Sequence, residues 1–119
     1  MQVQYRGDEV QIGGGFAGMR PLAQRGTVII DNGVLTLLGT QGQIIASGSL
    51  DTVEVKTIPI SRGQSVWVII DGVKYSVAVG FGAGITEGSP LHFGAFMDTR
   101  ADTQGFIAAF TALSGKPVR

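Results

Sequence analysis

The sequence predicts a mainly β domain, in which a seven-stranded antiparallel meander is followed by one C-terminal α-helix. Residues 26–79 divide into six short runs of β-branched and apolar side chains, separated by glycines and turn residues. Two of the separators are Asn32-Gly33 and Asp71-Gly72. These dipeptides favour the type I′ hairpin turn, because both of its central residues need positive φ. Apolar side chains at helical spacing then predict a helix near the C-terminus. A chain of 119 residues forms one domain with a single core.

Alternation within the six runs indicates which faces are buried. The runs span residues 27–30, 34–38, 43–47, 51–58, 65–70 and 73–79. In the fourth run, Val53, Val55 and Thr57 point to one side, and the intervening polar residues point to the other. The fifth run is apolar on both faces, which predicts a strand that is central or covered on its second side.

Residues 1–25 are predicted to be an N-terminal extension, with the main domain over 26–119. Residues 2–6 could add an edge strand and residues 9–12 a second short one. An alternative fold is therefore an eight- or nine-stranded sandwich or jelly roll, although a C-terminal helix argues against a pure sandwich. Residues 13–26 are rich in glycine and carry a proline, which predicts a loop, and its apolar side chains suit a flap or an oligomer contact.

That loop contains the pattern G-x-G-x-x-G at Gly13, Gly15 and Gly18. A dinucleotide fingerprint needs a helix that opens at the third glycine within a βαβ unit. Here Pro21 follows three residues later, and a hairpin comes next. The context therefore excludes a nucleotide site.

A second glycine-rich loop covers residues 80–90, and it lacks the lysine and the serine or threonine of a phosphate-binding P-loop. Residues 91–97 alternate and predict the seventh strand. His92 in this strand is the only histidine, and the sequence offers no orienting partner for it. We therefore expect no catalytic role for His92.

The C-terminal helix is predicted from Asp98 or Thr99, either of which can cap it, to a stop at Gly115. Asp102 falls in the first turn, where an acid suits the helix dipole. Apolar residues recur at i, i+3, i+4 and i+7 and form one stripe along the helix. It consists of Phe106, Ala109, Phe110 and Leu113. We expect both phenylalanine rings to be core residues that close an open end of the sheet.

Composition limits the classes of function. The chain has no cysteine, which excludes disulfides and cysteine zinc sites, and no metal or other cofactor is expected. Its net charge is zero and its basic residues are scattered, so no nucleic-acid footprint is present. Only 15% of residues are charged, against about 25% in an average domain, which favours self-association. The N-terminus has no signal region and no run approaches the roughly 20 apolar residues of a membrane helix. We expect a cytoplasmic protein.

Seven antiparallel strands and one amphipathic helix form the element order of a pleckstrin-homology-like (PH-like) domain. Residues 26–38 resemble the opening hairpin of bacterial PH-like and GRAM-like domains. Leu50-Asp51-Thr52-Val53 resembles their "leucine-x-x-valine" entry to the fourth strand. The resemblance implies a split barrel capped by the helix, used as a scaffold that binds a peptide between helix and sheet edge, or another subunit.

Two positions depart from the phosphoinositide-binding members of that family. Those members resemble one another in a basic first hairpin loop, whereas residues 31–33 here are tight and acidic. They also tend to carry a tryptophan on the C-terminal helix, whereas Trp67 lies on a predicted strand. We therefore do not expect phosphoinositide binding.

The sequence is most consistent with a non-enzymatic module that binds a protein partner or self-assembles as a homo-oligomer. The residues expected to make such contacts are Phe16, Met19, Arg20, Phe81, Ile85 and His92. One alternative is a structural component of a larger particle, such as a phage or envelope assembly. The other is a small-molecule-binding protein or enzyme that uses the barrel mouth and the glycine-rich flap. Its candidate polar residues are Asp51, Glu54, Arg62, Tyr75 and His92.

Overall fold

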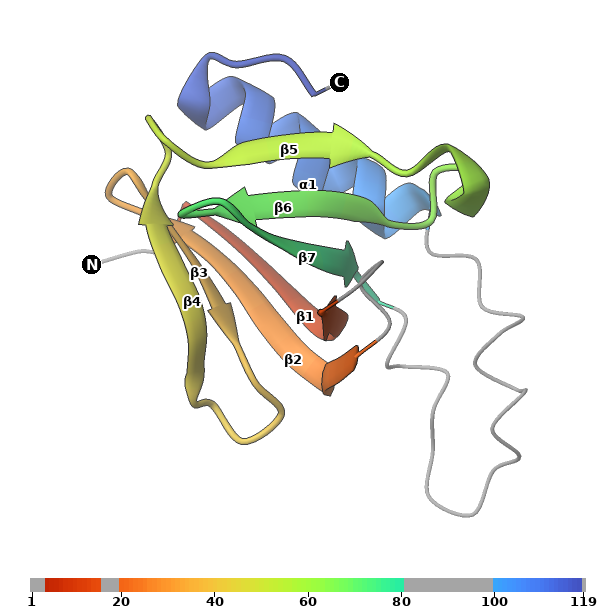
Figure 1. The fold of residues 1–119 in the computed structure, drawn as a ribbon. Helices are drawn as coiled ribbons and strands as arrows, with labels where there is room; N and C mark the ends of the chain where they lie inside the picture. Colours follow the sequence, from red (N-terminus) through yellow and green to blue (C-terminus); the bar gives the residue numbers. More distant parts are fainter. Residues whose placement is uncertain (1–3, 16–19, 81–99, 119) are drawn as a thin grey trace.

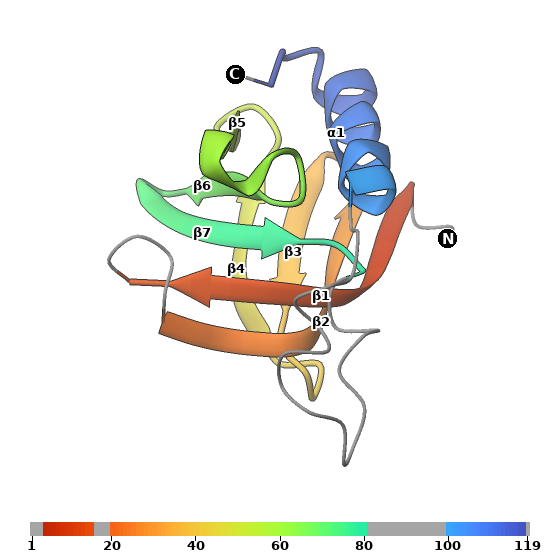
Figure 2. The ribbon, with the colours of Figure 1, turned by 90° about the vertical axis from the view of Figure 1, so that its right-hand side faces the viewer.

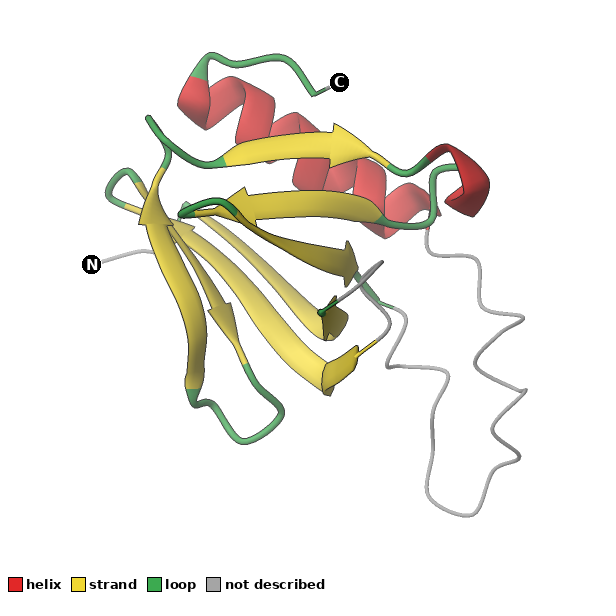
Figure 3. Cartoon of the chain, viewed as in Figure 1, coloured by secondary structure: helices red, strands yellow, loops and turns green. Residues whose placement is uncertain are grey.

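The computed structural model describes residues 4–15, 20–80 and 100–118, which form one antiparallel sheet and one α-helix (Figures 1 and 3). The strands are β1 (Tyr5–Gly14), β2 (Arg20–Asp31), β3 (Val34–Leu38), β4 (Ile44–Ser49), β5 (Glu54–Thr57), β6 (Val66–Ile70) and β7 (Val73–Ala78). A short 3-10 helix, η2 (Pro59–Ser61), precedes β6, and α1 (Arg100–Ser114) follows the strands. The predicted class, mainly β with seven antiparallel strands and a C-terminal helix, is confirmed.

The sheet is curled but not closed. Its strand order is β4-β3-β2-β1-β7-β6-β5, so β4 and β5 are the edges, and within the described residues they do not pair with each other. Only residues 11–13 of β1 pair with β7, which joins a four-stranded half to a three-stranded half. The curl brings Gly48 of β4 against Ile70 at the end of β6. Figure 2 shows α1 beside the N-terminal end of β1, on the open side of the sheet.

Both predicted hairpin turns are confirmed. Asp31 pairs with Val34 across Asn32 and Gly33, whose φ values are 53° and 78°. In the second hairpin, the central residues Asp71 and Gly72 have φ values of 52° and 78°. Positive φ at both central positions is the type I′ geometry, and its twist matches that of the strands it joins.

The N-terminal segment differs from expectation. Residues 5–14 form β1, which lies at the centre of the sheet and not at its edge, and β2 begins at Arg20 inside the predicted loop. The boundary expected after residue 25 falls within β2. The physical reason is a bulge at Glu9, whose φ is 56°. The extra residue changes the inward positions from odd numbers to even numbers, so one long strand does not read as one alternating run.

The strand predicted over residues 91–97 lies outside the described residues. The structure reaches seven strands because β1 joins the six that correspond to the predicted runs. In the run predicted over residues 51–58, Val53, which precedes β5, and Val55, which lies in it, are buried as predicted, whereas Thr57 is exposed and its predicted burial is wrong. β6 lies between β7 and β5, which confirms the central position predicted for the strand that is apolar on both faces.

The apolar stripe of α1 packs on the concave side of the sheet. Phe106 and Phe110 are both 0% exposed, which confirms them as core residues, and the Phe106 ring lies 5.7 Å from the ring of Tyr5. The helix ends where predicted: Gly115 has φ of 74° and its N–H donates to the carbonyl of Thr111. The expected caps at residues 98 and 99 lie outside the described residues.

One buried contact of α1 has no counterpart in the apolar pattern. The Thr103 side chain is fully buried, and its hydroxyl donates to the carbonyl oxygen of Gln64 at 2.9 Å. This bond ties the first turn of α1 to the loop before β6, where the apolar stripe makes no contribution. Among the residues that the structure describes, no helix combines the length and hydropathy needed to cross a membrane.

Candidate functional site: the groove between strand β5 and the end of helix α1

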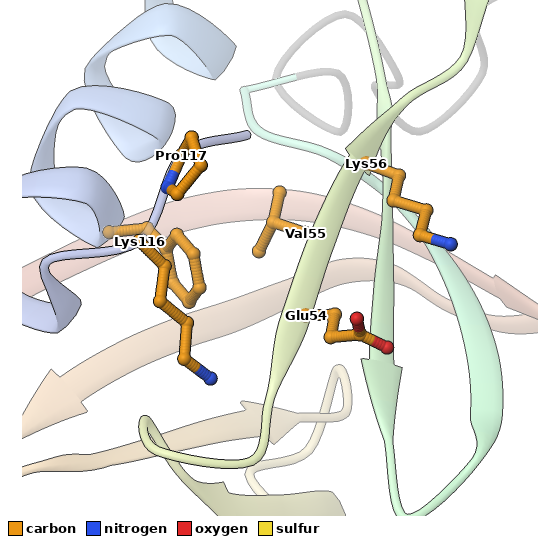
Figure 4. A pocket seen from close by; sticks show the side chains of 6 residues that line it. Glu54, Val55, Lys56, Lys116 and Pro117 are labelled. Atoms are coloured by element: carbon orange, nitrogen blue, oxygen red, sulfur yellow. The ribbon is translucent and has the colours of Figure 1, made fainter. Parts of the chain in front are cut away.

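A groove of about 300 Å³ lies between β5 and the C-terminal end of α1 (Figure 4). It is lined by Glu54, Val55, Lys56, Phe110, Lys116 and Pro117. Val55 and Phe110 supply an apolar floor, while Lys116 and Pro117 come from the segment after the helix. The side chains of Glu54 and Lys56 point away from Lys116, to the face of β5 opposite Val55, so Lys116 supplies the charge beside the groove.

The strand register determines which main-chain groups of β5 point toward β6 and which point away from it. Ile70 and Val73 flank a two-residue turn and so form a hydrogen-bonded pair. The main-chain N–H and C=O groups of the even-numbered residues of β6 therefore point toward β7. The main-chain groups of Trp67 and Ile69 therefore point toward β5, where these residues pair with Lys56 and Glu54.

It follows that Val55 points its own N–H and C=O away from β6. β5 is an edge strand, and within the described residues no hydrogen-bond partner is found for these two outward groups. An unpaired peptide group on an edge is the template for an added strand.

Lys116 closes one end of this edge. Its Nζ donates to the carbonyl of Asp51 at 2.5 Å and to that of Val53 at 3.1 Å. The backbone N–H of Lys116 donates to Ser114 Oγ at 3.1 Å, and that hydroxyl donates to the Phe110 carbonyl at 2.6 Å. The lysine is thus held at both its backbone and its ammonium group.

Of the six residues predicted to make partner contacts, the structure describes only Arg20, which is not part of the groove lining. Arg20 is exposed at the start of β2, where it pairs with Gly14. The other five (Phe16, Met19, Phe81, Ile85 and His92) lie outside the described residues, so their role stays a prediction.

Of the polar residues considered for small-molecule chemistry, His92 lies outside the described residues, and the other four do not form a shared site. Glu54 lies opposite Ile69 on the outer face of the sheet, whereas Tyr75 lies opposite Val68 on the inner face. Asp51 and Arg62 are exposed in two separate turns. Within residues 4–15, 20–80 and 100–118, no three His, Cys, Asp or Glu side chains are placed to hold a metal ion.

A second hollow, of about 470 Å³, lies between β1 and the start of α1. Tyr5, Asp8 and Asp102 are among its lining residues. Burial raises the pKa of Tyr5 to about 12, and the negative charges of Asp102 and Asp8 add to the shift. The phenol is therefore neutral across the physiological range.

Lys116 and Pro117 are the groove residues that sequence reasoning missed. In the sequence they follow the helix stop at Gly115, and a lysine and a proline in that position are typical of a helix end. Their approach to β5 depends on the path of the chain after the helix, for which the sequence carries no local signal. No protein-family model matches this chain, and no curated protein matches it.

Proposed function

We propose that this chain is a non-enzymatic interaction module, built on a PH-like scaffold whose curled sheet stays open, which binds an extended segment of a protein partner between β5 and the end of α1. The observation that carries the proposal is the outward-facing peptide group of Val55 beside an apolar floor. A strand added to an edge gains main-chain hydrogen bonds, and a neighbouring groove supplies specificity for alternate side chains.

The size and lining of the groove suit this role. About 300 Å³ accommodates one or two side chains of a bound segment, at the lower end of the range for ligand pockets. The exposed ring of Pro117 offers an apolar surface and carries no donor that would need a partner, while the side chains of Val55 and Phe110 are buried beside it. The groove therefore favours a short extended segment with an apolar anchor.

The test is selection of random linear peptides on the immobilised chain, followed by calorimetric titration of the selected peptides. Pro117→Trp places a large ring over the groove at an exposed position. Gln104→Trp places the same ring on an exposed position of α1 outside the groove lining and serves as the matched control.

We expect micromolar peptides that Pro117→Trp weakens at least about tenfold and that Gln104→Trp leaves unchanged. Peptides that bind both variants equally would place the binding surface elsewhere. If no peptide is enriched over the bare support, the proposed function is wrong.

A second candidate, self-assembly, is favoured by the other edge of the sheet. β4 has the sequence IIASGS, with no charged residue and no proline, and Ile44 is 69% exposed. Natural edge strands are usually protected by charge, proline or a cover, and an unprotected one can pair with a second copy. Sedimentation at tens of micromolar should then show a dimer or larger species that Ile44→Lys dissociates. A wild-type monomer would remove this candidate.

A further inference from the structure

The edge of β5 is available over a limited length. At Val53 both main-chain groups are already used, since its N–H donates to the Ser49 carbonyl at 2.9 Å and its C=O accepts from Lys116 Nζ. A docked segment therefore pairs with Val55, and its ladder stops before Val53. In an antiparallel segment, which matches every pairing in this sheet, the C-terminal end of the paired part arrives beside Lys116.

The charge of Lys116 is fixed at that point and is not neutralised locally. An ammonium group has three N–H donors, of which two are given to the carbonyls of Asp51 and Val53. Within the described residues, no carboxylate lies within salt-bridge distance of Lys116; the ion pairs found there join Arg6 to Asp8 and Arg25 to Glu9. One donor and a full positive charge thus remain for a bound group.

We propose that Lys116 determines the specificity of the groove by binding the carboxylate of an aspartate or glutamate in the docked segment. That acidic residue lies one or two positions after the residue that pairs with Val55. The inference rests on the proposed function, and it specifies which segments bind: an apolar anchor that contacts Pro117, followed by an acid.

The arrangement favours a carboxylate for two reasons. The ammonium is half-buried and held by two backbone carbonyls, so its side-chain entropy is already lost before a ligand arrives. Hydrogen bonds to a charged group are also about twice as strong as neutral ones. A neutral side chain at the same place would leave the ammonium without a counter-charge.

The experiment repeats the peptide selection with the wild-type chain, Lys116→Met and Lys74→Met. Methionine keeps most of the aliphatic stem and removes the charge. Lys74 lies over the Trp67 ring at 5.5 Å on the outer face of the sheet, so its variant changes net charge equally but leaves the groove intact. We expect aspartate or glutamate to be enriched at one fixed position with the wild-type chain and with Lys74→Met, but not with Lys116→Met.

A double-mutant cycle separates a direct contact from a structural effect. Changing the selected acid to its amide in the peptide, or Lys116 to Met in the protein, should each weaken binding about tenfold. Making both changes should weaken binding little further, because the same contact is lost twice. Amidated and free-acid forms of the peptide C-terminus should bind equally, since the proposal assigns the carboxylate to a side chain.

Three results would overturn the inference while leaving the proposed function intact. Selected peptides could lack an acid at a fixed position, the losses in the cycle could add fully, or the carboxylate could prove to be the C-terminus. A fourth result is a second copy as the occupant, which sedimentation would show as a dimer that Lys116→Met dissociates. If no peptide is selected at all, the proposed function itself fails.

Discussion

Replacement of Phe106 by alanine tests whether α1 is part of the core. The Phe106 side chain is 0% exposed, and its ring packs against the ring of Tyr5 at 5.7 Å with an interplanar angle of 47°. Burial of a phenylalanine contributes about 1.5–3 kcal/mol, and the cavity left by truncation raises the total cost to about 3–5 kcal/mol. The lost contact between the two rings is part of that total.

Urea unfolding followed by tryptophan fluorescence suits this measurement, because Trp67 is the only tryptophan and lies on the central strand β6. With an m-value of about 2 kcal/mol per molar urea, a loss of 4 kcal/mol lowers the midpoint by about 2 M. Phe106→Leu keeps an apolar side chain and should lie between the alanine variant and the wild type, so a result remains if the alanine variant does not fold.

The control is Gln104→Ala, an exposed position on the same helix, which should change the free energy of unfolding by less than about 0.5 kcal/mol. A loss below 1 kcal/mol for Phe106→Ala would mean that α1 does not pack on the sheet in solution. Equal losses for both variants would mean that the burial of Phe106 is not the source of the measured loss, since alanine does not lower helix propensity at either position.

Three further predictions concern single residues. In a Tyr75→Phe background, tyrosinate absorbance should show Tyr5 titrating near pH 12, and titration at pH 10 would contradict its burial. Because the pKa of tyrosine in the unfolded chain is about 10, the contribution of Tyr5 to stability should be constant below pH 10 and be lost between pH 10 and 12. Thr103→Val should cost about 1–3 kcal/mol in urea unfolding by removing a buried hydrogen bond, while the exposed Thr111→Val should cost far less. Gly105→Ala should increase the free energy of unfolding by about 0.5–1 kcal/mol and so raise the melting temperature, because an added Cβ meets no atom within 4 Å and glycine weakens a helix. A lower melting temperature would refute this.

The features predicted correctly are those encoded by neighbours in the chain. The two hairpin turns follow from dipeptides that accept positive φ, and the helix stop follows from Gly115. The buried faces of β5 and β6 follow from alternation. The core position of Phe106 follows from helical spacing. In each case the deciding interaction spans only a few residues.

The failures share one cause, which is dependence on residues far apart in the sequence. β1 was interpreted as two possible short strands, over residues 2–6 and 9–12, because the bulge at Glu9 shifts its alternation. Its continuity becomes evident only when β2 and β7 pair with it on both sides. Thr103 was missed because its partner, the carbonyl of Gln64, lies 39 residues away.

The class of fold follows from the amino-acid sequence, because turn chemistry and apolar periodicity are local properties of the chain. The central position of the N-terminal segment in the sheet, and the approach of Lys116 to β5 at the groove, are evident from the three-dimensional arrangement alone. Those outcomes depend on how the sheet curls and on where the chain goes after α1, and packing over the whole core selects both.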